Sequence, residues 1–555
     1  MKAPTKILFL EIDAGDKVLI QNWARDGSLP TFNRLLRDGL VGDTVSVRGL
    51  FVGSTWPSLY TGCNPARHGI YSLLQLNPGS YEHKLCPTGE HIKREPFWNY
   101  LSRAGRQVAV LDVPLSGISP GLNGIQTVEW GAHDANYGFR AWPPALKDEI
   151  EERFGTHPLQ GSCNAIGRTV EDFAAFRDTL VEGAARKGAL TRHFLSQGNW
   201  DFFGQVFTES HCVGHQCWHL HDPGHPGHDA GLASAVGDPI RDVYIAIDKA
   251  LGEIIADAGE DALVVVLAGH RMAHKFGATF LLPDILIRLG LAVPVAPATN
   301  RSQQQGAMAR LDAGLTRAWQ TIPAPVQRRL GGIRRTLRRW FDARPEATGR
   351  AAPPLPLPLR KLNPSLSHCF LVDNGHAVAG VRLNLKGREP NGLIDPGPEA
   401  IEFGQRLAED LKAIVNADTG RPIVREVVRT ADIFEGEHLD ILPDLLVEWD
   451  DATPLGSATA GNPGGSVLRV TSPKIGTVEG TNLYCRTGDH RPEGMFMALG
   501  PGIQPGRLDR MVSLMDFAPT FTNALGVEMP DTDGQPIPEL VAVLREHAEK
   551  GAAAV

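Results

Sequence analysis

The stretch ILFLEIDA, residues 7–14, decides the fold class of this chain of 555 residues. Five of the six residues from Ile7 to Ile12 are apolar, which predicts a buried strand, and Asp13 follows directly at its end. A nearly continuous apolar run, rather than an alternating one, is typical of a parallel strand that is covered on both faces. We therefore expect this stretch to be the first strand of an α/β sheet.

Strand-like and helix-like patterns alternate along the chain after this stretch. Helical spacing of apolar residues predicts helices over residues 30–39, 169–195, 241–256 and 516–525. Short apolar runs predict further strands over residues 108–111, 202–207, 263–267 and 495–499. Such alternation indicates a mostly parallel sheet with helices on both faces.

The composition excludes several classes of protein. The chain has 55 Lys and Arg against 63 Asp and Glu, a net charge of −8, which argues against binding of a nucleic acid polymer. No apolar run approaches the ~20 residues of a transmembrane helix, and the N-terminus lacks the pattern of a signal peptide. The seven cysteines show no disulfide framework, so we expect free thiols and a cytoplasmic protein. The sequence gives no indication of the oligomeric state.

The middle of the chain has a different composition, which sets the expected domain boundaries. Residues 281–361 form a Pro/Arg-rich insertion that ends in AAPPLPLP, residues 351–358. Within it, Arg328 to Arg339 lie on a basic amphipathic pattern, either a solvated helix face or a peripheral contact for an anionic surface. The expected parts are the first part of the α/β catalytic core at 1–280, this insertion, a cap and second part of the core at 362–480, and a closing part with the tail at 481–555.

Polar residues with metal-binding side chains follow several of the predicted strands. In an open parallel sheet, functional sites lie at the carboxyl ends of the strands. The residues at such positions are Asp13, Glu209, His211, His215 and His270, and His490 lies just before the late strand. Carboxylates and imidazoles together are the ligand set of zinc or a similar divalent ion.

Several motifs then resemble, in the right order, the alkaline phosphatase superfamily and specifically its type I phosphodiesterase and nucleotide pyrophosphatase branch. They are STWP at 54–57, TGCNP at 61–65, RHGI at 67–70, GH at 214–215, HRM at 270–272, RLNLKGREP at 382–390, His490, and MDFAPT at 515–520. The resemblance covers roughly residues 5–280 and 365–530. It implies an alkaline-phosphatase-like core with an inserted cap region.

The resemblance also implies a site for two divalent metal ions, with zinc expected and manganese as the alternative. One ion would be held by His211, His215 and His490. The second would be held by Asp13, Thr55 and His270, but Gly269 replaces an aspartate of the family pattern. The second ion is then bound more weakly, takes a water there, or recruits Glu209, Glu11 or His274, so we expect one or two ions per chain. We expect most of the six histidines within residues 211–228 to lie in a Gly/Pro-rich loop.

Thr55 is the nucleophile that the resemblance implies, at an expected helix start, and Ser54 is the alternative. Leu73 stands where nucleotide pyrophosphatases carry an asparagine, so a backbone amide or Asn77 would take over its contact with the phosphate. No substrate-binding residue is predicted. Trp130 to Asp134 either contact a leaving group or fill a turn.

These observations predict a metal-dependent hydrolase of small-molecule phosphate esters, as a phosphodiesterase or nucleotide pyrophosphatase with a threonine nucleophile. The alternatives are a phosphomonoesterase or sulfatase on the same core, or a metal-binding pseudoenzyme, which Gly269 would favour. Cys63 to Arg67 match the C-x-P-x-R pattern of sulfatases. In sulfatases the cysteine is the nucleophile, but here it lies after the expected nucleophile, within the TGCNP motif.

Overall fold

A computed structural model describes residues 6–86, 91–131, 137–159, 162–295 and 356–543. The contacts between Cα atoms divide the chain into a large unit, residues 1–293 with 356–555, and a small unit, residues 294–355. All helices and strands named below belong to the large unit. None of the described helices combines the length and the apolar character that crossing a bilayer requires.

A ten-stranded sheet forms the centre of the described part of the large unit. Its strands, in spatial order, are β20 (Gly506–Arg507), β2 (Leu40–Val45), β19 (Glu493–Leu499), β9 (Ala262–Ala268), β1 (Lys6–Ile12), β8 (Phe202–Phe207), β5 (Val108–Leu111), β6 (Gly124–Val128) and β7 (Arg140–Trp142), with β21 (Val512–Ser513) paired to β2. The predicted strands are confirmed, each to within two residues at either end. The stretch at residues 7–12 lies in the middle of the sheet.

The sheet is mostly parallel, with two antiparallel strands. Strand β1 runs parallel to β8 and β9, and β5 runs parallel to β8 and β6. Strand β19 runs antiparallel to both β9 and β2, and β7 runs antiparallel to β6. The beginning of β19 therefore lies at the edge of the sheet where the parallel strands end.

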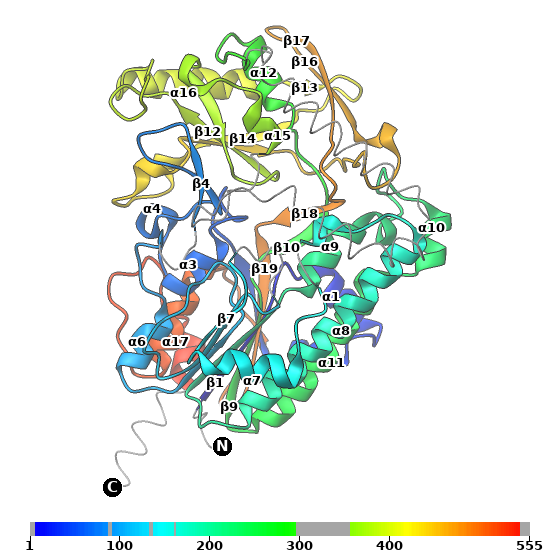
Figure 1. Ribbon diagram of the computed structural model, residues 1–555, viewed down its shortest axis with the longest axis vertical. Helices are drawn as coiled ribbons and strands as arrows, with labels where there is room; N and C mark the ends of the chain where they lie inside the picture. Colours follow the sequence, from blue (N-terminus) through cyan, green and yellow to red (C-terminus); the bar gives the residue numbers. More distant parts are fainter. Residues whose placement is uncertain (1–5, 87–90, 132–136, 160–161, 296–355, 544–555) are drawn as a thin grey trace, which may run out of the picture. The chain divides into compact units, whose positions relative to one another are not determined.

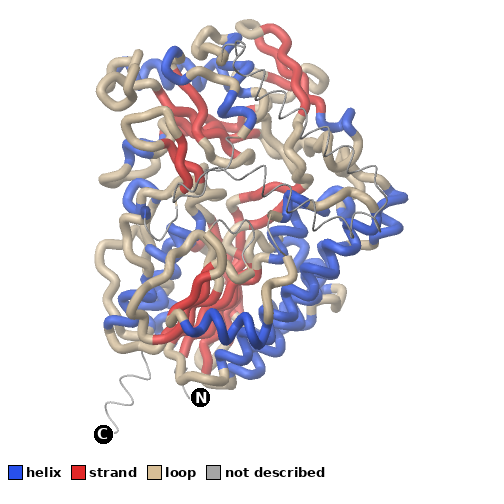
Figure 2. Tube along the Cα trace, viewed as in Figure 1, coloured by secondary structure: helices blue, strands red, loops and turns tan. Residues whose placement is uncertain are grey.

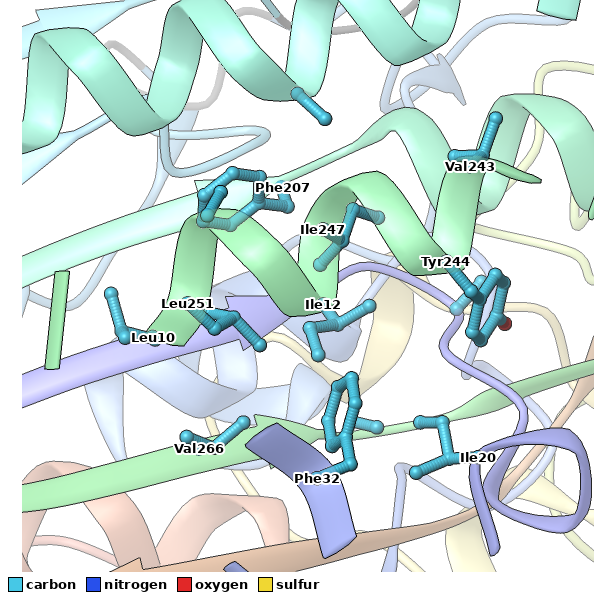
Figure 3. Packing of buried hydrophobic residues seen from close by; sticks show 14 of the residues in the cluster. Leu10, Ile12, Ile20, Phe32, Phe207, Val243, Tyr244, Ile247, Leu251 and Val266 are labelled. Carbon is cyan, nitrogen blue, oxygen red and sulfur yellow. The ribbon is translucent and has the colours of Figure 1, made fainter. Parts of the chain in front are cut away.

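Helices cover both faces of this sheet (Figure 1). Side chains alternate along β1, so Leu8, Leu10 and Ile12 pack on one face and Ile7 and Phe9 on the other. The first face is covered by α1 (Lys17–Arg25), α2 (Pro30–Asp38), α8 (Val170–Leu195) and α11 (Pro239–Ala258), and Figure 3 shows α11 and α2 packed against β1. The second face is covered by α3 (Thr55–Thr61), α6 (Phe97–Arg103) and α17 (Phe517–Ala524). The predicted fold class, a mostly parallel sheet between two helical layers, is confirmed.

A second, antiparallel sheet lies in the part of the chain after residue 361, and Figure 2 shows it as a group of strands separate from the central sheet. Its order is β11 (Cys369–Val372), β12 (Val378–Leu383), β15 (Leu445–Trp449) and β14 (Val424–Arg429). It has its own hydrophobic core, to which α12 (Leu282–Arg288) and α16 (Pro398–Lys412) contribute. A three-stranded sheet joins β13 (Val415–Asn416), β16 (Val467–Ser472) and β17 (Gly476–Thr481).

The remaining elements connect these layers. They are α4 (Pro65–His68), α7 (Ala145–Phe154), α9 (Glu209–His221), α10 (Ala230–Val236), α15 (Leu357–Arg360) and the strand pairs β3 (Leu74–Leu76) with β4 (His83–Leu85) and β10 (Arg271–His274) with β18 (Gly488–Arg491). The expectation of a loop for most histidines within residues 211–228 is wrong, because α9 carries His211, His215, His219 and His221. The basic pattern from Arg328 to Arg339 lies outside the described residues.

Candidate active site

The predicted polar residues meet at the carboxyl edge of the central sheet. Asp13 follows β1, helix α9 begins two residues after β8, and His270 follows β9. His490 belongs to β18, which leads into the antiparallel strand β19 and so approaches the same edge from the other direction. One cavity of about 630 Å³ is lined by Asp13, Thr55, His211, His270 and His490.

Three imidazoles form a compact cluster at this edge. His211, His215 and His490 are buried, and one ring nitrogen of each lies within 4.8 Å of the others. The rings of His211 and His215 come from one helix, four residues apart, with centroids 4.4 Å from each other. Such spacing places two side chains on the same face of a helix.

The hydrogen bond of His215 with the backbone defines its tautomer. Nδ1 of His215 lies 2.9 Å from the carbonyl oxygen of Gly488, which can only accept, so Nδ1 carries the proton. Nε2 is then a lone-pair nitrogen, 3.1 Å from Nε2 of His490. Two nitrogens bound to one tetrahedral zinc ion at ~2.0 Å lie about 3.3 Å apart. The cluster therefore fits a zinc-type ion, and the backbone orients one of its ligands.

Two glycines allow the helix and the strand that carry these imidazoles to approach each other. A Cβ atom at Gly488 would lie 2.2 Å from the carbonyl oxygen of Gly214, and a Cβ atom at Gly214 would lie 2.8 Å from Cγ of Met272. A Cβ atom essentially never lies within 3.0 Å of a non-bonded heavy atom, so neither position accepts a larger residue without a shift of its surroundings. The glycine at position 214, within α9, is thus what lets His211 and His215 reach His490.

A second group of ligands lies beside the first. Nε2 of His270 is 3.7 Å from Oδ1 of Asp13, and the rings of His270 and His490 have centroids 4.9 Å apart. Ala14, which follows Asp13, has a φ of +53°, a conformation that non-glycine residues rarely adopt and that concentrates at functional sites. Gly269 lies next to His270 and contributes no side chain to this group.

Thr55 is the first residue of helix α3, and its hydroxyl is buried in a short chain of hydrogen bonds. Oγ1 lies 2.5 Å from the carbonyl oxygen of Phe51 and 2.6 Å from Oγ of Ser46. Because a carbonyl only accepts, Thr55 donates to Phe51 and Ser46 donates to Thr55. Ser54, in contrast, donates to the carbonyl of Ile70 at 2.7 Å and is not among the described residues that line the cavity.

Two of the residues considered as replacements for the missing aspartate have other partners. Oε1 of Glu209 accepts a hydrogen bond from Nε2 of His157 at 3.0 Å and lies 3.4 Å from the Lys187 ammonium. Although burial opposes it, Lys187 and His157 hold the pKa of Glu209 below its usual value. Nε2 of His274 lies 2.9 Å from the carbonyl oxygen of Asp451. None of Glu209, His274 and the third candidate, Glu11, is among the described residues that line the cavity, so the partners of Glu209 and His274 are what distinguish them from Glu11.

The structure also shows where other residues considered in the sequence lie relative to the cavity. Leu73 lines the cavity, whereas Asn77 is not among its described lining residues. Trp130 packs in the hydrophobic core and donates from its indole nitrogen to the carbonyl of Gly155 at 3.0 Å, while His133 and Asp134 lie outside the described residues. Asn384 fixes a turn through hydrogen bonds to the backbone at Ser367 and elsewhere.

The Cys63 thiol lies 3.6 Å from the carbonyl oxygen of Asp531 and is not among the described residues lining the cavity. Burial raises its pKa to about 11, which disfavours the thiolate that a nucleophilic cysteine needs. Cys212 and Cys217 are buried and form no disulfide bond among the described residues.

Ser46 and Arg486 belong to the site but were not predicted. Ser46 follows β2, a strand that the sequence analysis did not recognise, so the rule that located Asp13 and His270 would have found it. Arg486 lines the cavity, donates from Nη1 to Nε2 of His215 at 2.8 Å and is held through Nε by Oδ1 of Asn164 at 2.9 Å. No local pattern distinguishes this arginine from the others of the chain. It brings a positive charge to the imidazole cluster.

Buried imidazoles and a carboxylate around one cavity, at the edge where parallel strands end, are features of a metal-dependent hydrolase. The family model for type I phosphodiesterase / nucleotide pyrophosphatase matches residues 7–292, more than half of the chain, and the protein belongs to this family. It is accordingly a phosphoester hydrolase of the alkaline phosphatase superfamily, whose members depend on metal ions.

Similar folds occur among solved structures at low sequence identity. Phosphonoacetate hydrolase from Sinorhizobium meliloti 1021 is 14% identical, with a TM-score of 0.49 over 98% of this chain and 96% of that chain. Murine ectonucleotide pyrophosphatase / phosphodiesterase 5 is 11% identical, with a TM-score of 0.44 over 96% and 97%. The alkaline phosphatase PafA is 14% identical, with a TM-score of 0.49 over 98% and 99%. No curated protein matches the sequence.

Proposed function

We propose that this hydrolase cleaves phosphodiesters or nucleotide pyrophosphates, with Thr55 as nucleophile at a site for two divalent ions, preferably zinc. The observation that carries the proposal is the position of the Thr55 hydroxyl, on the same cavity as Asp13, His270 and two of the three clustered imidazoles. Family membership supports the reaction class.

The residues present fit two ions side by side. His211, His215 and His490 would hold one ion, and Asp13, His270 and Thr55 would contribute to the other. When bound, two divalent ions supply positive charge that stabilises both the attacking and the leaving oxygen of a phosphoester. The three-imidazole set suits zinc and also accepts manganese, iron or cobalt.

Among the residues of the chain, Thr55 would act as the nucleophile and Ser46 would orient its hydroxyl group. Oγ1 of Thr55 attacks phosphorus, a new O–P bond forms, and the P–O bond to the leaving group breaks. The Ser46 hydroxyl keeps Oγ1 oriented while the Thr55 proton passes to a water molecule in the cavity, and the leaving group departs with the electron pair of the broken P–O bond. Water then cleaves the phosphothreonine ester and restores the hydroxyl. With an ion bound to Nε2 of His215, the hydrogen bond from Arg486 to that nitrogen would be displaced, and the guanidinium group, which lines the cavity, would then bind a phosphate oxygen.

The region 362–480 would act as a cap that selects the leaving group. Residues 373–376, between β11 and β12, and residues 479–480, at the end of this region, line the cavity. The rings of His376 and Tyr484 stack there, with centroids 3.9 Å apart and an angle of 24° between their planes. We also propose the parts 1–280, 281–361, 362–480 and 481–555 as the functional divisions of the chain.

The nucleophile is tested with bis-p-nitrophenyl phosphate in the presence of Zn²⁺ or Mn²⁺. Thr55→Ala is expected to lose at least about a thousandfold in kcat, because the attacking oxygen is gone. Ser54→Ala, the matched control one residue away, should remain within about threefold of the wild type, since its hydroxyl bonds Ile70. Undiminished turnover by Thr55→Ala would remove Thr55 from the mechanism.

Comparison of aryl phosphodiester, phosphomonoester and sulfate ester substrates distinguishes the related activities. We expect the highest kcat/KM with the diester. Cys63→Ser should keep this activity, whereas a sulfatase that uses Cys63 would lose it. Metal binding without turnover on any of these substrates would instead indicate the pseudoenzyme.

A further inference from the structure

A second carboxylate lies beside Asp13 at the end of strand β1. Glu11 is two residues before Asp13, and side chains at this spacing along a strand lie on the same face of the sheet. Its side chain is completely buried. Both carboxylate oxygens are inaccessible to solvent, no described side chain pairs with them, and the backbone amide of Gly269 is the donor beside them.

The Glu11 carboxylate lies in the space beside Gly269. A Cβ atom built on Gly269 would be 3.5 Å from Oε1 of Glu11, which is van der Waals contact. The same Cβ atom would lie 3.0 Å from Cδ2 of Leu514, closer than side chains normally pack. A side chain at position 269 would therefore compete with both Glu11 and Leu514 for this space.

Two buried carboxylates beside one imidazole require positive charge. An unpaired carboxylate inside a protein is strongly disfavoured, and such groups are normally paired with a cation or bound to a metal. Among the described residues, no lysine or arginine forms a salt bridge with Glu11. A divalent ion is the partner that fits a mixed carboxylate and imidazole set.

We propose that Glu11 supplies a carboxylate ligand to the second divalent ion, together with Asp13 and His270, in place of a side chain at position 269. This inference rests on the two-ion site of the proposed function. Gly269 follows β9, which pairs with β1, the strand that carries Glu11. The absence of a side chain at Gly269 therefore leaves room for the Glu11 carboxylate.

The number of bound ions tests the proposal without reference to turnover. Purified protein is stripped with a chelator, titrated with Zn²⁺ by calorimetry, and assayed by elemental analysis. The wild type should bind two ions per chain. Glu11→Gln, which keeps the shape but not the charge, should bind one ion tightly at the imidazole cluster and the second at least about tenfold more weakly.

A second test removes the carboxylate at position 11 and introduces one at position 269. Glu11→Ala should lose the second ion, and the double variant Glu11→Ala/Gly269→Asp should regain it, because the alanine vacates the space that the new aspartate needs. Gly269→Asp alone should lower the melting temperature, since its side chain meets Leu514 and Glu11. Retention of the first ion and a cooperative thermal transition show that each variant has folded.

Two results would overturn the inference. One is a wild-type protein that binds a single ion, and the other is a Glu11→Gln protein that binds two ions with unchanged affinity. A failure of the proposed function would give a different result. If the protein binds two ions, and the second depends on Glu11, but no phosphoester is turned over, the activity is rejected and the assignment of Glu11 as a ligand still holds.

Discussion

Ser46 and Thr55 show how much depends on single hydroxyl groups at this site. The Ser46 hydroxyl donates to Oγ1 of Thr55, and nothing in the pattern around residue 46 predicts this contact. Ser46→Ala should lower kcat about tenfold, equivalent to about 1.4 kcal/mol, because the orientation of Oγ1 is lost, while KM changes little. Steady-state kinetics on the diester measures both constants.

Ser58→Ala is the matched control for this variant. Ser58 is also a buried serine, but its hydroxyl pairs with Nε2 of His68 at 2.8 Å and it is not among the described residues lining the cavity. It should lose about 1 kcal/mol of stability and keep its kcat. A Ser46→Ala enzyme with wild-type kcat would show that the hydrogen bond is structural.

Individual site residues could be predicted where they directly follow a recognisable strand. Asp13 and His270 are of this kind, and the spacing of four residues between His211 and His215 places both side chains on one face of α9. Ser46 directly follows β2 and was missed together with that strand, whereas Arg486 does not directly follow any described strand. Arg486 contacts its partners only through the folded chain, across hundreds of residues from Asn164 and His215. The presence of Glu11 in a buried strand is visible in the sequence, but its proximity to Gly269 depends on the pairing of β1 with β9.

At the scale of elements, the position of helix α9 depends on Gly214. Gly214→Ala places a methyl group 2.8 Å from Cγ of Met272, and we expect α9 to shift away from β10 and carry His211 and His215 with it, because Cβ of Met272 is also close, at 3.3 Å. Zinc affinity at the imidazole cluster should fall at least about tenfold, because ligand positions tolerate little displacement. Calorimetric titration of the stripped protein gives this affinity.

Gly404→Ala provides the comparison for this helix glycine. Gly404 lies within α16, and a Cβ atom there would lie 3.5 Å from Cδ2 of Leu445, an ordinary contact. The substitution should stabilise the protein by about 0.5–1 kcal/mol through helix propensity and leave zinc binding unchanged. Equal zinc affinities in Gly214→Ala and the wild type would contradict the role given to Gly214.

Strands β1, β5, β8, β9 and β19 could be predicted because each contains a nearly continuous apolar run, whereas β2, with Gly42 and Asp43 in its middle, has no such run and was missed. The interpretation of residues 211–228 failed for a physical reason. Glycine and histidine are poorer helix formers than alanine or leucine, so the sequence of α9 favours a loop, and its buried packing against α11, α8, β10 and β18 stabilises the helix. The antiparallel sheet of β11, β12, β15 and β14 was not predicted in detail, because its strands pair across a long chain separation.

The stability of the whole molecule depends on buried histidines that stay neutral. His68 is completely buried; its Nδ1 accepts from the amide of Ile70 at 3.1 Å, so Nε2 carries the proton and donates to Ser58. Burial lowers the pKa of His68 to about 3. In the unfolded chain this residue titrates near 6.5, so the unfolded state alone takes up its proton below that pH. The contribution of His68 to stability therefore falls as the pH falls from 6.5 toward 3.

Several buried carboxyl groups, Glu11 among them, have raised pKa values, so their contribution to stability grows as the pH falls. The wild type must therefore be compared with a His68 variant to separate the effect of His68 from theirs. His68→Gln should be less stable than the wild type at pH 8. The difference in free energy of unfolding should shrink by about 1.4 kcal/mol for each pH unit between pH 6 and 4. Denaturant unfolding in the presence of a chelator measures it, and a difference that does not change with pH would refute the prediction.

The reversed strand β19 has a consequence for how the protein is made. It joins β2 to β9, and it follows directly on the strand that carries His490, near residue 490 of a chain of 555. Before the ribosome has synthesised β19, neither β2 nor β9 can form the hydrogen bonds that each makes with this strand. The imidazole cluster then consists of His211 and His215 alone, because His490 has not yet been added. Closure of the sheet and completion of the imidazole cluster thus depend on the same segment, so a nascent chain that has not yet reached this segment can complete neither.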